Sequence, residues 1–153
     1  MSTLPVAPRV SIVVPSFNEL PQTVGASLAS VRAQTMGDFE CIVVDESTDE
    51  SRARACREFC EADSRFIYLH PSERLGLAGS LNLGLARARG ALVARFDADD
   101  LCEPERLALI RARFFRDARS LGRPMPLARQ ADADPAQALY VENGVELVMK
   151  PDP

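Results

Sequence analysis

The chain has 153 residues, of which 46% are hydrophobic and 26% charged, and its formal net charge is −4 at pH 7. This size and balance predict one globular domain with a sizeable core. An acidic chain without a basic stripe is not expected to bind nucleic acid. No apolar run reaches the roughly 18 residues of a transmembrane helix. Residues 1–9 lack a signal-peptide pattern, so we expect a cytoplasmic protein.

Short apolar runs alternate with helical patterns along the first 121 residues. The expected elements are strands at 10–14, 39–44, 66–70 and 92–96, a helix opening at Pro21, and helices at 51–62, 77–88 and 104–121. Apolar strands that alternate with helices indicate a parallel sheet covered on both faces. In such folds, ligands bind beyond the carboxyl ends of the strands, where the strand order reverses.

Residues 97–100 read Asp-Ala-Asp-Asp and directly follow the fourth expected strand. Carboxylates this close raise one another's pKa values unless a cation or hydrogen-bond donors intervene. Mg²⁺ typically takes one or two carboxylates and completes its shell with water and substrate phosphates. The tetrapeptide therefore predicts either a metal-dependent phosphate site or a cap for the next helix, with Asp99 or Asp100 near the helix N-terminus.

Two more polar segments, residues 15–19 and 45–49, follow the first and second expected strands. Three polar segments at one sheet edge favour a binding site over three separate solvated loops. Phe17 is a candidate to cover a nucleobase, Asp45 to accept hydrogen bonds from a base or ribose, and Arg74 to contact a diphosphate or base. The alternatives are a turn at Phe17, a helix cap at Asp45 and an ordinary surface arginine. We assign the capping of the next helix to residues 47–49 and recognition to Asp45.

Other nucleotide motifs are missing from the sequence. It has no Gly-rich dinucleotide fingerprint, Walker A loop or nucleophile elbow. We therefore expect a divalent cation, rather than backbone amides, to hold a diphosphate. The four cysteines lack zinc-site spacing, so we expect reduced structural residues.

The character of the chain changes after Leu121. Residues 122–135 have no periodicity and read as a linker, and Asn143-Gly144 between two apolar runs predicts a β-hairpin. We expect residues 1–121 to form a nucleotide-binding domain. Residues 122–153 would be a linker plus hairpin, either a shortened acceptor region or the stub of a truncated one.

Five segments resemble, in order, the successive motifs of the family 2 glycosyltransferases: residues 10–19, 30–35, 43–49, 76–82 and 96–100. The resemblance implies a GT-A fold, a Rossmann-like, mostly parallel sheet flanked by helices. It also implies Mn²⁺ or Mg²⁺ and transfer, with inversion, from a nucleotide sugar that we expect to be UDP-linked. The implied acceptor is a glycan or a lipid-linked glycan in cell-surface polysaccharide synthesis, at the inner face of the membrane beside a membrane-bound assembly.

The resemblance also assigns residues. Pro15, Phe17 and Glu19 would line the nucleoside pocket, and Asp45 would contact the base. Arg74 would lie near the donor. Asp97 would hold its ribose or sugar side, and Asp99 would bind the metal that bridges the diphosphate. Asp100 would then be the cap of the next helix.

The sequence departs from the family pattern at two places. Glu46 leads straight to Ser47, which shortens the loop after Asp45, and Glu46 itself reads as a solvated residue. The acidic catalytic base, which the family carries far downstream, has no identifiable counterpart, although Glu142 and Glu146 are available carboxylates. The alternative functions are a non-catalytic nucleotide-sugar-binding module or fragment that lacks the base, and a structural partner in a larger assembly.

Overall fold

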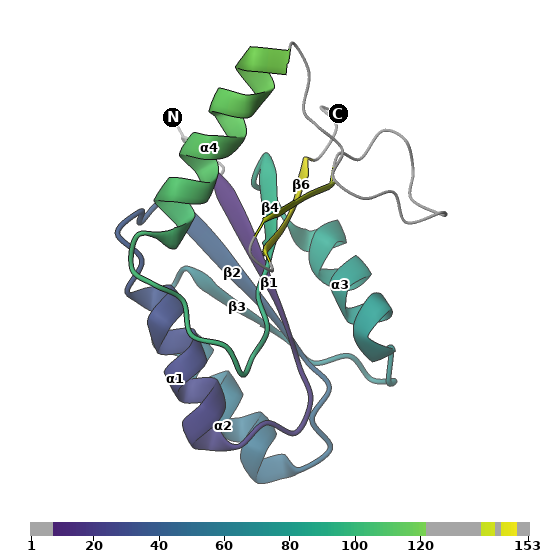
Figure 1. Ribbon diagram of the computed structural model, residues 1–153. Coiled ribbons are helices and arrows are strands. Elements are labelled where there is room, and N and C mark those ends of the chain that lie inside the picture. The colour runs from purple at the N-terminus through teal and green to yellow at the C-terminus, as the bar shows by residue number, and fades with distance from the viewer. Residues whose placement is uncertain (1–7, 122–138, 143–144, 150–153) are drawn as a thin grey trace, which may run out of the picture.

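The computed structural model describes residues 8–121, 139–142 and 145–149 (Figure 1). Its elements are β1 (Val10–Ser16), α1 (Pro21–Arg32), β2 (Phe39–Asp45), α2 (Glu50–Glu61), β3 (Phe66–Leu69), α3 (Gly76–Arg87), β4 (Leu92–Arg95), α4 (Arg106–Leu121), β5 (Leu139–Glu142) and β6 (Val145–Met149). The predicted alternation of strands and helices is confirmed, with element ends shifted by at most two residues. None of the helices within the described residues is long and apolar enough to span a bilayer.

The strands form one sheet in the order β3-β2-β1-β4-β6-β5. The first four strands are parallel, as predicted, whereas β6 runs antiparallel to both β4 and β5. Residues 143–144 lie outside the described part, so the predicted hairpin turn stays a prediction. Because β2 and β4 lie on opposite sides of β1, the strand order reverses at β1, and this is where the fold class binds ligands.

The first strand runs two residues further than predicted, through Pro15 to Ser16. A proline in a central strand normally breaks a ladder, because it has no N–H to donate. Here the pairing of β1 with β4 stops at Val13, while the pairing with β2 continues to Ser16. Pro15 therefore has a neighbouring strand on one side only, and the end of β1 projects beyond β4 at the reversal point.

Helices cover both faces of the sheet (Figure 1). Alternate β1 residues such as Ile12 and Val14 pack in a core with α1, α2 and the start of α4, whereas Val13 faces α3. The α3 side is tight, because a Cβ added to Gly84 would lie 2.3 Å from a Val13 methyl carbon. This packing fixes α3, and with it the segment that precedes α3, against the sheet.

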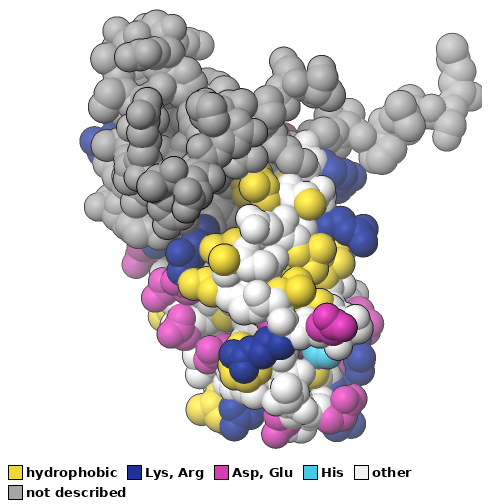
Figure 2. Space-filling view, turned by 90° about the vertical axis from the view of Figure 1, so that its right-hand side faces the viewer, with side chains coloured by type: hydrophobic (Ala, Val, Ile, Leu, Met, Phe, Trp, Pro, Cys, Tyr) yellow, Lys and Arg dark blue, Asp and Glu magenta, His cyan; other side chains and the backbone are white. Residues whose placement is uncertain are grey.

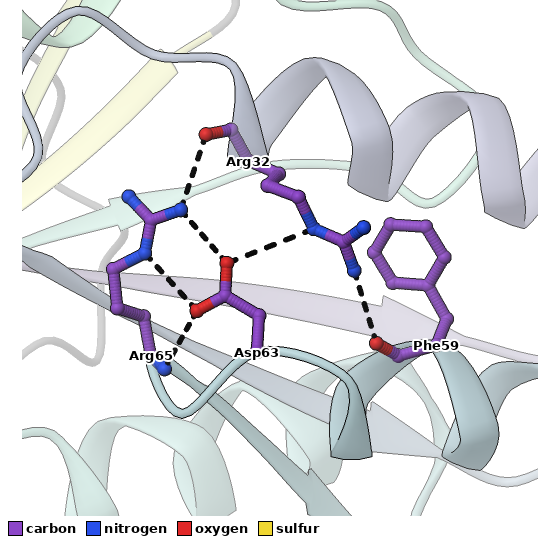
Figure 3. A network of polar contacts seen from close by, with 4 residues as sticks. All are labelled: Arg32, Phe59, Asp63 and Arg65. Carbon is purple, nitrogen blue, oxygen red and sulfur yellow. Dashed lines mark hydrogen bonds and ion pairs between the residues drawn. The ribbon is translucent and has the colours of Figure 1, made fainter.

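A polar network joins α1 to the α2–β3 connection at the amino end of the strands (Figure 3). The Asp63 carboxylate lies 2.8 Å from Arg65 Nη2 and 3.6 Å from Arg32 Nε. The Arg32 guanidinium donates to the Phe59 carbonyl at 3.2 Å and lies 4.0 Å from the centre of the Phe59 ring. One carboxylate thus links two arginines that belong to different elements.

Replacing Asp63 with asparagine is expected to make stability less dependent on acid pH. The hydrogen bond from the Arg65 side chain lowers the pKa of Asp63 to about 2, against the opposing effect of burial. A lowered pKa means that the carboxylate stabilises the fold above its unfolded pKa of about 3.9 and loses this effect as pH falls toward 2. We expect Asp63→Asn to lower the free energy of unfolding by about 1–2 kcal/mol at pH 7, measured with urea, and by progressively less below pH 4.

Asp38→Asn is the matched control for this prediction. Asp38 pairs with Arg9 at 3.0 Å, but both side chains are more than half exposed. Such a pair contributes about 0–1 kcal/mol. A destabilisation by Asp63→Asn that is the same at pH 7 and pH 3 would contradict the role of the charged carboxylate.

Candidate functional site

The carboxyl ends of β1, β2 and β4 lie at one edge of the sheet, and a polar segment follows each of them. Asn18 joins the first two segments. Its Oδ1 accepts from the backbone N–H groups of Thr48 and Asp49 at 3.0 and 3.1 Å, and its own N–H donates to Ser47 Oγ at 2.8 Å. Asn18 has a φ of 52°, a left-handed conformation in which asparagine is favoured over most residues. The loops after β1 and β2 therefore form one unit, as the predicted convergence requires.

Asp45 ends β2 and is completely buried. Its Oδ1 accepts from Ser47 N and Oγ at 3.1 and 2.6 Å, and its Oδ2 accepts from the Tyr68 hydroxyl at 2.9 Å. Burial, together with this hydrogen bond, raises the pKa of Tyr68, so the hydroxyl stays a donor at neutral pH. A direct contact between Asp45 and a nucleobase would need one of these bonds to open, and its assignment to the base stays a prediction.

The capping predicted for residues 47–49 is divided among different roles. Asp49 caps α2, because its side chain accepts from the N–H groups of Ser51 and Arg52 at 3.0 and 3.1 Å. Ser47 and Thr48 instead bond to Asp45 and Asn18. One residue of the three caps the helix, and the other two shape the loop at the end of β2.

Phe17 and Arg74, both predicted to contact the donor, lie against each other. The Arg74 guanidinium carbon is 3.7 Å from the centre of the Phe17 ring, within the range of an attractive cation–π contact. The Phe17 side chain is 38% exposed. Pro15 and Glu19, assigned to the same pocket, are half-buried in β1 and in the loop after it.

Glu46 is not the solvated residue that the sequence suggested. It is half-buried, and its carboxylate accepts hydrogen bonds from Ser80 Oγ and from the N–H groups of Leu75 and Gly76, at 2.5, 2.5 and 3.1 Å. The side of the molecule that carries α3 shows hydrophobic side chains between charged ones (Figure 2). The hydrogen bonds of Glu46 tie the segment that holds Arg74 to the end of β2.

The acidic tetrapeptide follows β4. Asp97 pairs with Arg95 at 3.1 Å between Oδ1 and Nε, and its carbonyl accepts from Ser27 Oγ at 3.2 Å. Asp99 and Asp100 are both exposed and are the last two residues of a turn that the Asp100 N–H closes with the Asp97 carbonyl at 3.2 Å. Asp97 is thus partly neutralised by its neighbour, whereas the Asp99 carboxylate faces solvent.

The capping role that the sequence favoured for Asp100 is wrong. The next helix begins only at Arg106, too far along the chain for Asp100 to cap it. Gln34, just beyond α1, supplies the cap instead, because its Oε1 accepts from the Leu107 N–H at 3.0 Å. Its Nε2 also donates to the Glu103 carbonyl at 2.7 Å, so Gln34 holds the segment between the tetrapeptide and α4.

The tetrapeptide suits a cation whose coordination shell is completed by a bound ligand. Within the described ranges no three His, Cys, Asp or Glu side chains are grouped to hold an ion. Asp97 and Asp99 therefore offer one or two carboxylates and no closed cage. That donor set fits Mg²⁺ or Mn²⁺ when water and a bound diphosphate supply the other oxygens.

The family model described as Glycosyl transferase family 2 matches residues 11–124, which include all three polar segments. The chain belongs to glycosyl transferase family 2. The predicted resemblance is confirmed. The chain is 34% identical over 101 residues to an uncharacterized glycosyltransferase of Methanocaldococcus jannaschii, covering 65% of this chain and 35% of that protein.

A second relative has a more specific name. It is the UDP-Glc:alpha-D-GlcNAc-diphosphoundecaprenol beta-1,3-glucosyltransferase of Escherichia coli, 36% identical over 92 residues. The match covers 60% of this chain and 35% of the E. coli protein. The chain thus spans about a third of the length of these two relatives.

Solved structures agree with the family assignment. A mannosyltransferase of Pyrobaculum calidifontis, in complex with GDP-Man and Mn²⁺, matches 63% of this chain and 29% of its own, with a TM-score of 0.54 and 31% identity. TarS of S. aureus, residues 1–349 with UDP-GlcNAc, matches 72% of this chain and 32% of its own, with a TM-score of 0.61 and 23% identity. The chain has the GT-A arrangement that the sequence predicted.

Proposed function

We propose that this glycosyltransferase chain binds a UDP-linked sugar with Mn²⁺ or Mg²⁺ and transfers the sugar, with inversion, to a glycan or lipid-linked acceptor. The observation that carries the proposal is the tetrapeptide at residues 97–100, with its exposed Asp99, at the reversal point of the sheet in a family 2 chain. The nucleotide sugars named with the E. coli relative and the P. calidifontis enzyme support a donor of this class.

The first loop would hold the nucleoside. Pro15, Phe17 and Glu19 would line the pocket, and Arg74 would lie near the base or the diphosphate. The cation–π contact between Arg74 and Phe17 supports this grouping. Asp45 would approach the base once a bond from Ser47 or Tyr68 opens.

The tetrapeptide would hold the diphosphate and the sugar. Asp99 would bind the metal, and Asp97, steadied by Arg95 and Ser27, would hold the ribose or sugar side. A divalent cation bound there would supply positive charge to offset the charge that develops on the departing nucleoside diphosphate. The carboxylates of this chain would thus orient the donor while its leaving group departs.

The catalytic base has no assignment. Glu142 and Glu146 belong to β5 and β6, and their side chains lie outside the described part of the structure. We assign donor binding to residues 1–121 and leave the acceptor side to residues 122–153 or to other parts of a longer protein. The proposed setting is cell-surface polysaccharide synthesis at the cytoplasmic face of the membrane, beside a membrane-bound assembly.

A calorimetric panel with Mn²⁺ tests the donor. UDP, GDP, CDP and ADP would be titrated into the chain, followed by sugar derivatives of whichever nucleotide binds. We expect UDP to bind at least about tenfold more tightly than the others, because a pocket that hydrogen-bonds the base rejects bases with a different donor and acceptor pattern. Preference for GDP would overturn the uridine assignment but keep a nucleotide-sugar site.

Donor hydrolysis separates an enzyme from a binding module. Release of free sugar from the preferred donor, with or without candidate acceptors, would be followed by chromatography. Slow hydrolysis that needs Mn²⁺ supports a transferase. Tight binding without turnover in any acceptor mixture favours the non-catalytic module.

A further inference from the structure

The carboxylate of Glu46 connects two elements that are distant in the sequence. Glu46 directly follows β2, and its three hydrogen-bond donors lie at the start of α3. Leu75 is the N-cap residue of α3 and has no polar side chain to cap the helix. Glu46 therefore serves as the cap from outside the helix, where a negative charge also interacts favourably with the helix dipole.

The environment keeps this carboxylate charged. Burial acts to raise the pKa of Glu46, but the hydrogen bonds from Ser80, Leu75 and Gly76 and the nearby Arg74 outweigh it, so the pKa is lowered. Gly76 has a φ of 70°, a left-handed conformation that glycine adopts without strain. The backbone can thus present two consecutive N–H groups to one carboxylate oxygen.

Arg74 immediately precedes the two residues that Glu46 holds. Its guanidinium reaches across to the ring of Phe17, in the loop after β1. The backbone position of Arg74 is set by the Leu75 and Gly76 bonds, since no regular element covers residues 70–75. Glu46 thus ties this segment by hydrogen bonds to the residue that follows β2.

We infer that Glu46 is a positioning residue: by holding the backbone of Leu75 and Gly76, it places Arg74 over Phe17 and so sets the affinity for the nucleotide part of the donor. This role rests on the proposed function. In this role Glu46 contacts Leu75 and Gly76, next to Arg74, and does not itself contact the donor.

The first test observes the stacked pair without any ligand. Protons of the Arg74 side chain lie over an aromatic ring, so their NMR resonances carry a ring-current shift that Phe17→Leu removes. We expect Glu46→Gln to move the Arg74 resonances most of the way to their Phe17→Leu positions, because the amide offers one accepting oxygen in place of two and lacks the charge that strengthens these bonds. Ser80→Ala, which removes one of the three bonds, should move them in the same direction by less.

Glu61→Gln is the matched control, because Glu61 is exposed at the end of α2. It should leave the Arg74 resonances where they are in the wild type. The inference would be overturned if the Arg74 resonances stayed unchanged in both Glu46→Gln and Ser80→Ala. It would also be overturned if the Arg74 resonances of the wild type equalled those of Phe17→Leu, because Arg74 would then not lie over the ring.

The second test measures UDP affinity with Mn²⁺. We expect Glu46→Gln to weaken binding about tenfold, as loss of hydrogen bonds to a charged group would. The double variant Glu46→Gln/Arg74→Ala should bind no more weakly than Arg74→Ala alone, because Glu46 acts through Arg74. Additive losses would overturn the inference.

The two tests separate the inference from the proposed function. If the wild type binds no nucleotide, the proposed function fails, while the NMR shifts still decide whether Glu46 positions Arg74. If Glu46→Gln fails to fold, Ser80→Ala decides through both measurements. A Ser80→Ala variant with wild-type resonances and wild-type affinity would then overturn the role of Glu46.

Discussion

Asp99→Asn is expected to remove the Mn²⁺-dependent part of UDP binding. Asparagine keeps the size of the side chain but loses the charge that a hard divalent cation requires. Substituting even the partners of metal ligands costs about 10–100-fold in metal affinity, so the loss of a ligand should cost at least about 100-fold. Calorimetry with and without Mn²⁺ measures the effect, and the weak metal-independent binding should not change.

The adjacent residue provides the control for Asp99. Asp100 is equally exposed and carries the same charge, but only its backbone N–H takes part in the turn. Asp100→Asn should therefore bind UDP and Mn²⁺ nearly as the wild type does. Loss of Mn²⁺-dependent binding in Asp100→Asn but not in Asp99→Asn would move the metal site by one residue and contradict the assignment.

Glu40→Ala is expected to have the largest effect on stability. Glu40 is 2% exposed and accepts from Ser11 Oγ at 2.6 Å and from the Arg89 N–H at 2.7 Å, and its other oxygen lies 2.7 Å from Arg89 Nη2. The Arg89 side chain is 52% exposed, so its charge stays solvated in the variant, and the expected loss is that of the buried hydrogen bonds of Glu40, about 2–3 kcal/mol. Urea unfolding of the variant measures this loss.

The pH dependence of the wild-type stability should reflect the ionisation of Glu40. Burial acts to raise the pKa of Glu40, but the hydrogen bonds from Ser11 and Arg89 outweigh it, so the pKa is lowered. Glu40 therefore stabilises the fold above its unfolded pKa of about 4.3 and loses this effect as pH falls. The difference between wild type and Glu40→Ala should shrink below that pH.

Glu61→Ala, an exposed glutamate in α2, should change stability by less than about 0.5 kcal/mol. Glu40 lies at the amino end of β2, away from the carboxyl edge, so the folded variant should still bind UDP with Mn²⁺. A Glu40→Ala variant that is as stable as the wild type at pH 7 would contradict the stabilising role of the contacts that Glu40 makes with Ser11 and Arg89.

The fold was predictable from sequence because its signals are local and repeated. Apart from Ser11 and Glu40, the runs Val10 to Val14 and Phe39 to Val44 are apolar, as is typical of strands buried on both faces. The parallel topology then brings distant polar segments to one edge without any contact being predicted. Phe17 and Arg74, which the family resemblance placed near the donor, lie in contact in the structure.

The supporting contacts were not predictable, because a side chain that reaches another element leaves no periodic signal. Gln34 caps α4 and Glu46 caps α3, each from a residue distant in the sequence. Both residues look like ordinary surface positions in the sequence, and the local rules for caps pointed to Asp100 instead. Pro15 was taken as the end of β1 because the sequence does not show that β4 stops pairing at Val13.

The central claim is that this chain carries a donor site in which a divalent cation joins Asp99 to a nucleoside diphosphate. Calorimetric titration of UDP into the wild-type chain, first with Mn²⁺ and then with excess chelator, tests it most directly. We expect UDP to bind one-to-one in the presence of Mn²⁺, with an affinity that falls at least about 100-fold when chelator is added. Equal affinity under both conditions, or no binding of any nucleoside diphosphate with Mn²⁺, would contradict it.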